Sequence, residues 1–390
     1  MENILSYHKK EYEESPLVIV EVPGTCTLLG SYSDSCKGWS LLGTDVATLF
    51  VGISQRNDQL VRLANATLND RKRFSLSNIK FRKEDRWGNY IKGVIGILAS
   101  EGVEFSGLNV TVEGPLLLSD NQMVSSAIAL GVCMALNALM DLQMSISSMI
   151  RVIYQANTTF NNELCKISDL LTMINGQKGK VLFFDLQHLT FQELGFPFTE
   201  ESEEYVALII DSKISPNAMR EEIATKRKDI EVAFSKLKEL KPGGFIRDFP
   251  ESDLSARVVP LEEDVRHICE YILMESRLTF DAAFMLSPKD AMLYGKTMVK
   301  IQTGLRDLLE VSCPEVDWLT KRSSEINGSV GAVLVSNGFS GNVMVLLSKQ
   351  ALPSYISRLE EYEHIFGFHP RWYIYEGGGS AKVVFQEQHI

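Results

Sequence analysis

The stretch 125–139 constrains the fold of this chain most, because it is apolar on nearly every helical face. A helix with one polar face can lie at a protein surface, whereas a helix that is apolar all round must be buried on most sides. Such burial requires a large core with other elements around the helix. The chain has 390 residues, 45% of them hydrophobic, which is enough for such a core and suggests two domains.

Short β-branched runs and amphipathic stretches follow one another in mixed order along the chain. We predict strands at 17–22, 48–53, 60–63, 108–112, 181–184, 206–210, 333–335, 343–347, 372–375 and 382–385, with Pro23 and Gly24 ending the first. We predict helices at 87–98, 125–139, 145–154, 170–174, 217–240, 261–275, 290–310, 315–325 and 352–364, the third with a serine as its cap. This order indicates an α+β fold. The acidic, polar segment 198–204 suggests a link between domains 1–200 and 201–390.

The charge and the cysteines bear on partners and on compartment. A net charge of −11 argues against nucleic acid and anionic membranes as general partners. The basic run 226–228 lies in a helical pattern, and we interpret it as a solvated helix face. We expect no secretory leader and no membrane span. The six cysteines show no paired CxxC spacing, so we expect reduced thiols and a cytoplasmic protein.

Three loop segments, 22–34, 115–127 and 336–341, follow strands and contain turn residues or a carboxylate. The second segment leads into the apolar helix. Loops that enter helices can bind phosphate through free N–H groups and the positive end of the helix dipole. On spacing alone, each segment is more often an ordinary turn.

The order of these segments resembles the GHMP small-molecule kinases, and within them galactokinase, over residues 17–385. The similarity is best outside the loops, in WGNYIKGV at 87–94, YGKTM at 294–298 and LRDLLEVSCPEVD at 305–317. Arg257, Glu275 and Arg277 fall in another galactokinase-like stretch. The resemblance implies an N-terminal domain like the second domain of ribosomal protein S5 and a ferredoxin-like C-terminal domain. It also implies an active site in the cleft between them.

The first loop keeps part of the family pattern PGRVNLIGEHTDY. The matching positions are Pro23, Gly24, Leu28, Gly30 and Asp34, and the replaced ones are Thr25, Thr27, Ser31 and Tyr32. By resemblance, Thr25 stands where an arginine stabilises the transferring phosphoryl group. Ser31 and Tyr32 stand where a glutamate and a histidine hold the sugar, and Asp34 is the sugar-holding residue that remains. Without the resemblance, Asp34 is a turn residue.

The family's phosphate loop, GAGLSSSAAL, is matched at its end by Ser125, Ser126 and Ala127. Asp120 and Gln122 stand at its glycine positions. Glycines let the backbone approach phosphate, whereas a carboxylate 4 Å from one phosphate charge costs about 4 kcal/mol at an effective dielectric of 20. The third segment keeps two of the family's glycines, Gly338 and Gly341.

Further replacements fall on the metal and sugar positions that the resemblance implies. Asn157 stands where a glutamate binds Mg, and Ile223 stands where a tyrosine contacts galactose. Asp169 matches the catalytic carboxylate, a general base, although an aspartate there also stabilises the start of a helix. Lys166 replaces a glycine of the sugar pocket. We hypothesise that its ammonium pairs with Asp169 or Asp34, and the alternative is a solvated surface lysine.

Together these replacements predict a galactokinase-like pseudokinase with a binding, regulatory or assembly role. Its partner is an unknown small molecule in the interdomain cleft, another protein or a second copy. ATP and Mg are implied by the family alone. The alternative is an active ATP-dependent kinase for another sugar or an acidic metabolite. Asp169 would be its base, Ser125 and Ser126 would help to hold Mg–ATP, and Tyr32 and Lys166 would reshape the acceptor pocket. An ordinary galactokinase requires the most compensations.

Overall fold

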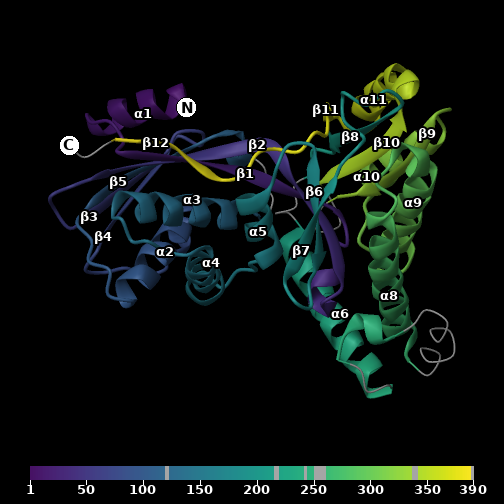
Figure 1. Cartoon of the computed structure of the whole chain (residues 1–390), viewed down its shortest axis with the longest axis horizontal. Coiled ribbons are helices and arrows are strands. Elements are labelled where there is room, and N and C mark those ends of the chain that lie inside the picture. The colour runs from purple at the N-terminus through teal and green to yellow at the C-terminus, as the bar shows by residue number, and fades with distance from the viewer. Residues whose placement is uncertain (119–122, 215–218, 241–243, 250–260, 336–340, 388–390) are drawn as a thin grey trace. The chain divides into compact units, whose positions relative to one another are not determined.

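The computed structural model describes residues 1–118, 123–214, 219–240, 244–249, 261–335 and 341–387. The chain forms two compact units, each built from separate stretches of sequence (Figure 1). Unit 1 comprises Met1–Thr25, Thr44–Gln177 and Gly378–Ile390, and unit 2 comprises Cys26–Gly43 and Lys178–Gly377. Compact units need not coincide with family domains, so the domains 1–200 and 201–390 stay a prediction.

Unit 1 contains a sheet with the strand order β12-β1-β2-β5-β3-β4. Its strands are β1 (Val18–Leu29), β2 (Trp39–Gln55), β3 (Leu60–Asn65), β4 (Asp70–Ser75), β5 (Leu108–Glu113) and β12 (Lys382–Gln386). β3 and β5 are parallel, whereas β1 pairs antiparallel with β12, and β2 with β5. Both β1 and β2 continue into unit 2.

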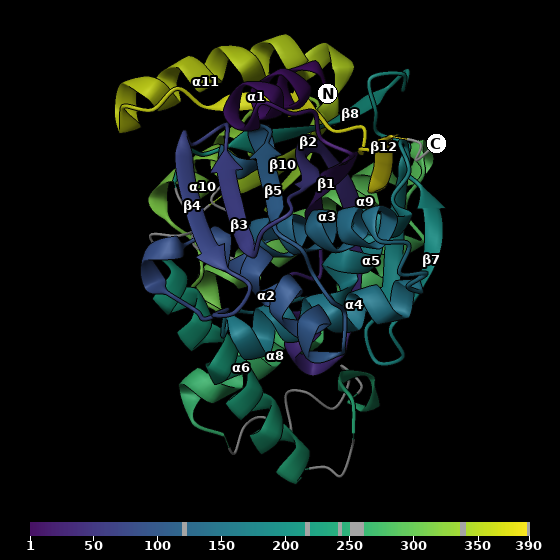
Figure 2. The same ribbon diagram turned by 90° about the vertical axis from the view of Figure 1, so that its left-hand side faces the viewer.

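Helices cover both faces of this sheet. One face carries α1 (Glu2–Tyr12), and the other carries α2 (Gly88–Ser100), α3 (Met123–Leu139) and α4 (Ile146–Gln155), as Figures 1 and 2 show. The predicted burial of α3 is confirmed, because most of its side chains are buried. The predicted cap of α4 is also confirmed, since Ser145 Oγ accepts a 3.2 Å hydrogen bond from the backbone N–H of Ser148. The helix α5 (Ile167–Asn175) follows.

The prediction that Pro23 and Gly24 end the first strand is wrong, because β1 continues to Leu29. Proline disrupts a strand when the ladder needs its missing N–H group. The pairing of β1 with β12 covers Val18 to Glu21 and stops before Pro23. No ladder bond to β12 is therefore lost at the proline.

Unit 2 contains a four-stranded antiparallel sheet with the order β11-β8-β10-β9. Its strands are β8 (Tyr205–Asp211), β9 (Ser329–Leu334), β10 (Asn342–Ser348) and β11 (Arg371–Ile374). The helices are α6 (Arg220–Leu240), α8 (Glu263–Ala283), α9 (Ala291–Asp307), α10 (Pro314–Ser324) and α11 (Leu352–Phe366). The start of β2 pairs with β6 (Lys180–Asp185), which pairs with β7 (Thr190–Gly195). In Figure 1, α8 and α9 run beside each other.

Three further features bear on the sequence predictions. The helix α1 and the strands β4 and β7 were not predicted. All six cysteines are free, in agreement with the expected reduced thiols. Among the described residues, no helix combines the length and the apolarity that crossing a bilayer requires.

Candidate functional site

The candidate base Asp169 lies in the first turn of α5 and is half-buried. Its Oδ1 accepts a 2.9 Å hydrogen bond from Thr25 Oγ1, at the end of the unit 1 part of β1. Thr25 is 3% exposed, and its backbone N–H lies 2.8 Å from Met123 Sδ at the start of α3. The two predicted positions are thus brought together, with a neutral hydroxyl facing the carboxylate.

Lys166 is the residue that precedes α5, and it is half-buried. Its backbone is extended there, and its side chain does not cap the helix. The pairing of its ammonium with Asp169 or Asp34 stays a prediction.

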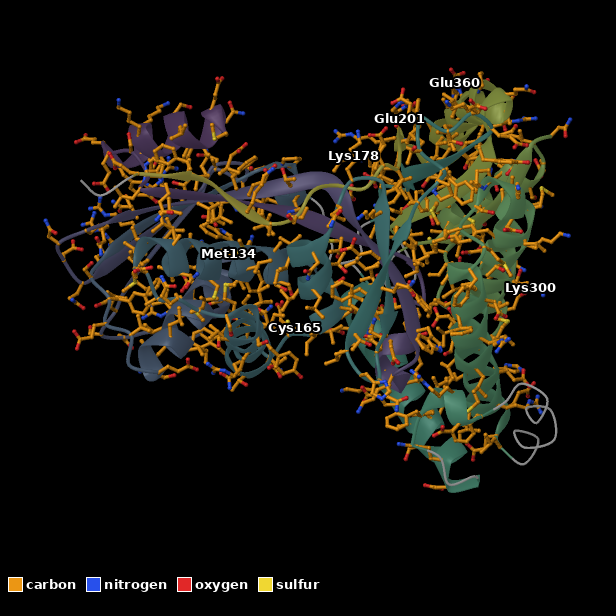
Figure 3. The ribbon with its side chains drawn as sticks, viewed as in Figure 1. Met134, Cys165, Lys178, Glu201, Lys300 and Glu360 are labelled. Atoms are coloured by element: carbon orange, nitrogen blue, oxygen red, sulfur yellow. The ribbon has the colours of Figure 1, made fainter. Side chains whose placement is uncertain are left out.

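The position implied for metal binding holds a neutral, buried pair. Asn157 follows α4 and is fully buried, and its Nδ2 donates a 3.3 Å hydrogen bond to Ser126 Oγ in α3. Cys165, labelled in Figure 3, lies with its Sγ 3.7 Å from the same Oγ, and burial raises the pKa of its thiol. Ser125 and Ala127, which flank Ser126 in the sequence, are also buried.

These residues do not fit a divalent cation. Magnesium is held in proteins by carboxylates, phosphates and water oxygens. The buried Oδ1 of Asn157 has no hydrogen-bond partner among the described residues, but one neutral oxygen does not make such a site. In the described part of the chain, no cluster of three histidine, cysteine, aspartate or glutamate side chains could hold a metal ion.

Several predicted site residues lie outside the described part of the chain, namely Asp120, Gln122, Arg257 and Gly338. Gly341 is described, and it has a φ of 113°, a conformation that favours glycine. Its carbonyl oxygen accepts a 3.3 Å hydrogen bond from the N–H of Ser212, which follows β8. The backbone conformation at this position of unit 2 therefore explains a glycine at residue 341.

Asp34 in unit 2 is paired with an arginine that the sequence analysis missed. Arg227 Nη1 lies 2.9 and 3.0 Å from the two carboxylate oxygens of Asp34, and its Nη2 donates to the carbonyl oxygen of Ser31 at 3.3 Å. Its guanidinium also lies 5.4 Å from the ring centre of Tyr32. The interpretation of 226–228 as a solvated face is wrong for Arg227, which is 8% exposed.

A buried carboxylate from α8 holds the backbone next to Asp34. Glu275 is 1% exposed and accepts hydrogen bonds from Tyr271 Oη at 2.9 Å, Ser33 Oγ at 3.2 Å and the N–H of Tyr32 at 3.3 Å. Burial raises its pKa to about 7, although these three donors favour the ionised form. Tyr32 itself is fully buried, and burial raises the pKa of its hydroxyl.

The turn before this segment requires the glycine that the family pattern also has. Gly30 has a φ of 81°, and a Cβ there would lie 2.3 Å from the carbonyl oxygen of Trp39. Ile223, at the position of the galactose-contacting tyrosine, is fully buried in α6. The segment 30–36 is therefore fixed by backbone geometry and by buried contacts within unit 2.

Comparisons with known proteins agree with the resemblance seen in the sequence. No protein-family model matches the chain. The putative galactokinase of Treponema pallidum (strain Nichols) is 28% identical over 98% of this chain and 97% of its own length. The crystal structure of Lactococcus lactis galactokinase complexed with galactose matches with a TM-score of 0.88 at 17% identity, covering 98% of this chain and 99% of that one.

These matches show that the chain is similar to galactokinases of the GHMP kinase superfamily over nearly its whole length. Within the superfamily it is most like galactokinase. The fold extends to other members, since the crystal structure of Methanococcus jannaschii mevalonate kinase matches with a TM-score of 0.65 at 16% identity, covering 92% of this chain and 98% of that one. The predicted α+β GHMP kinase fold is confirmed.

Proposed function

We propose that this galactokinase-like chain binds a small molecule but does not transfer a phosphoryl group to galactose. The contact between Thr25 and Asp169 carries the proposal, because a hydroxyl stands where the family's arginine would supply positive charge. Phosphoryl transfer depends on electrostatic stabilisation of the charge that develops on the transferring group. A threonine at this position supplies no such charge.

Two further observations support the loss of the reaction. The neutral pair of Asn157 and Ser126 does not fit the magnesium ion that the family uses. The carboxylate of Asp34, which by resemblance would hold the sugar, is paired with Arg227. A hydroxyl of a bound sugar would have to compete with a charge-assisted pair for this carboxylate.

A second candidate is an active kinase for another small molecule, with Asp169 as the base. The observation that favours it is the placement of this carboxylate, which is half-buried and oriented through one oxygen by Thr25. A general base needs such a fixed position within hydrogen-bond reach of its substrate. A single coupled assay of ADP release decides between the two candidates.

We expect no release of ADP from ATP and galactose above the background of an Asp169→Asn variant in a coupled assay with magnesium. Asparagine keeps the shape of the side chain and can still accept from Thr25, so this variant is a matched control for the chemistry. A panel of other sugars and hydroxy acids extends the assay to the second candidate. A wild-type rate clearly above that of Asp169→Asn with galactose contradicts the proposal, and such a rate with another substrate establishes the second candidate.

Thermal shifts measured with the same protein separate binding from turnover. A ligand at 100 times its dissociation constant stabilises a protein by about 2.7 kcal/mol. We expect no shift with Mg–ATP. A shift with galactose and none with Mg–ATP supports binding without phosphoryl transfer.

A further inference from the structure

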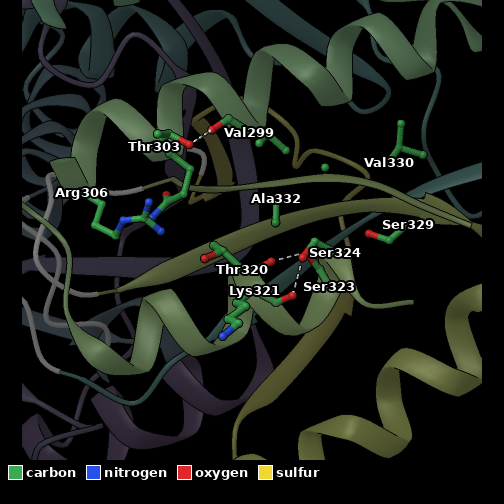
Figure 4. A pocket seen from close by; sticks show the side chains of 12 residues that line it. Val299, Thr303, Arg306, Thr320, Lys321, Ser323, Ser324, Ser329, Val330 and Ala332 are labelled. Carbon is green, nitrogen blue, oxygen red and sulfur yellow. Dashed lines mark hydrogen bonds between the residues drawn. The ribbon is translucent and has the colours of Figure 1, made fainter. Parts of the chain in front are cut away.

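A pocket of about 290 Å³ lies in unit 2 between α9, α10 and the edge strand β9. None of the candidate site residues above lines it. Figure 4 shows the lining side chains Thr303 and Arg306 on α9, Thr320, Lys321, Ser323 and Ser324 on α10, and Ser329, Val330 and Ala332 on β9. Its volume is close to the lower end of ligand pockets, about 300 Å³, which suits a small metabolite.

The floor of the pocket is fixed by a close packing of backbones. A Cβ on Gly331 of β9 would lie 2.2 Å from the carbonyl oxygen of Gly295 in α9, so the helix rests directly on the strand. Gly331 and Ala332 are both buried and small. The space above them is therefore present before any ligand binds.

The pocket has positive charge and no carboxylate among its lining residues. Arg306 and Lys321 supply the charge from two different helices. Arg306 donates through Nε and Nη2 to Asp307, an exposed neighbour, and pairs of this kind are weak. Within the described part of the chain, neither the Nη1 of Arg306 nor the ammonium of Lys321 has a hydrogen-bond partner. Both cations are therefore available to an anionic ligand.

The hydroxyl groups of the pocket are arranged to accept hydrogen bonds. Thr303, Ser323 and Ser324 each donate to a carbonyl oxygen of their own helix, at 2.9, 2.7 and 2.6 Å. Figure 4 draws these bonds as dashed lines. Since their protons are used, the lone pairs that remain favour a ligand with its own O–H donors. Ser329 Oγ is buried and has no partner among the described residues, a state that costs free energy unless a ligand or water satisfies it.

We propose that this pocket binds a small sugar phosphate. Its phosphate pairs with Arg306 and Lys321, and its hydroxyl groups donate to the serine and threonine oxygens. A neutral sugar would leave the cations unused, and inorganic phosphate would leave the hydroxyl lining unused. This pocket is separate from the candidate site residues described above, and the proposal does not depend on whether the chain phosphorylates a substrate.

The test is calorimetric titration of the full chain with ribose 5-phosphate, with ribose and inorganic phosphate as the matched partial ligands. We expect ribose 5-phosphate to bind most tightly, and its dissociation constant to rise about tenfold for each of Arg306→Gln and Lys321→Gln. Lys300→Gln removes an exposed cation of α9 that does not line the pocket, and it should leave binding unchanged. Thermal unfolding of each variant checks that the fold is kept.

Three results would overturn the proposal. The first is no binding of ribose 5-phosphate up to about 10 mM, a concentration above which affinity is negligible for a metabolite. The second is equal binding by wild type and by the double variant of Arg306 and Lys321, which would place the ligand elsewhere. The third is inorganic phosphate binding as tightly as the sugar phosphate, because the hydroxyl lining would then contribute nothing.

Discussion

Replacing Arg227 by methionine lowers the free energy of unfolding by about 3 kcal/mol, because it leaves the partly buried carboxylate of Asp34 without its cation. The side chains of Arg227 and Asp34 are 9% and 21% exposed, which places the effect at the lower end of that for a buried pair. The variant also loses the contact with the ring of Tyr32. Urea unfolding of wild type and variant measures the difference.

One control changes another cation of α6, and the other changes Asp34, the partner of Arg227 in the ion pair. Lys228→Met changes an exposed cation one residue away and should alter the free energy of unfolding by less than about 0.5 kcal/mol. Adding Asp34→Asn to Arg227→Met should recover part of the loss, since the orphaned charge is then gone. If Arg227→Met unfolds like Lys228→Met, the pair does not stabilise unit 2.

Acidification from pH 6.5 to pH 4 removes about 3 kcal/mol of stability through His8, a fully buried residue of α1. Its ring nitrogens lie 2.9 Å from Thr111 Oγ1 and 3.0 Å from Ser54 Oγ. Burial lowers its pKa from 6.5 to about 4, and nearby Glu14 opposes the shift. Between pH 6.5 and pH 4 the unfolded chain therefore binds a proton at His8, whereas this histidine stays neutral in the folded chain. The free energy of unfolding therefore decreases as the pH is lowered.

Glu275 acts in the opposite direction. Its pKa is raised from 4.5 to about 7, so the folded chain binds the extra proton and gains stability as pH falls through this range. The wild-type profile is therefore shallow, and the difference between wild type and His8→Asn isolates the histidine. His364→Asn, at an exposed position, should follow wild type. Parallel pH profiles for wild type and His8→Asn would refute the assignment.

The elements with a clear hydrophobic period could be predicted from the sequence. The apolar pattern of α3 and the serine cap of α4 depend on neighbouring residues alone, so both predictions were confirmed. The helix α1 was missed because it meets the sheet through a polar residue, His8, with Ile4 as its other buried side chain. A helix buried by hydrogen bonds has no apolar stripe to detect.

Arg227 shows a signal that was present in the sequence and overlooked. Ile223, Ile230 and Phe234 lie four residues before it and three and seven residues after it, so all four share one helical face. The lysines on either side lie on other faces of the helix. The run of three cationic residues therefore led to the prediction of a solvated helix face. Its partner Asp34 could not be predicted, because 193 residues separate the two in the chain.

The candidate site was predicted by position but not by contact. The family patterns identified Thr25, Asn157 and Asp169 as candidate site residues but did not show which residues they contact. The hydrogen bonds from Thr25 to Asp169 and from Asn157 to Ser126 depend on how separate elements pack, which no local pattern encodes. Glu275 was noted for its family-like surroundings, whereas its role in holding the segment 32–33 emerged from two hydrogen bonds, which Ser33 Oγ and the N–H of Tyr32 donate to it.

The pairing of β1 with β12 has a consequence for synthesis on the ribosome. β1 emerges long before its partner β12, which spans Lys382–Gln386. Until β12 emerges, the Val18–Glu21 edge is a hydrogen-bonding template without its native strand, and such edges recruit foreign strands. A nascent chain stalled before residue 382 should therefore need chaperone protection that the released protein does not.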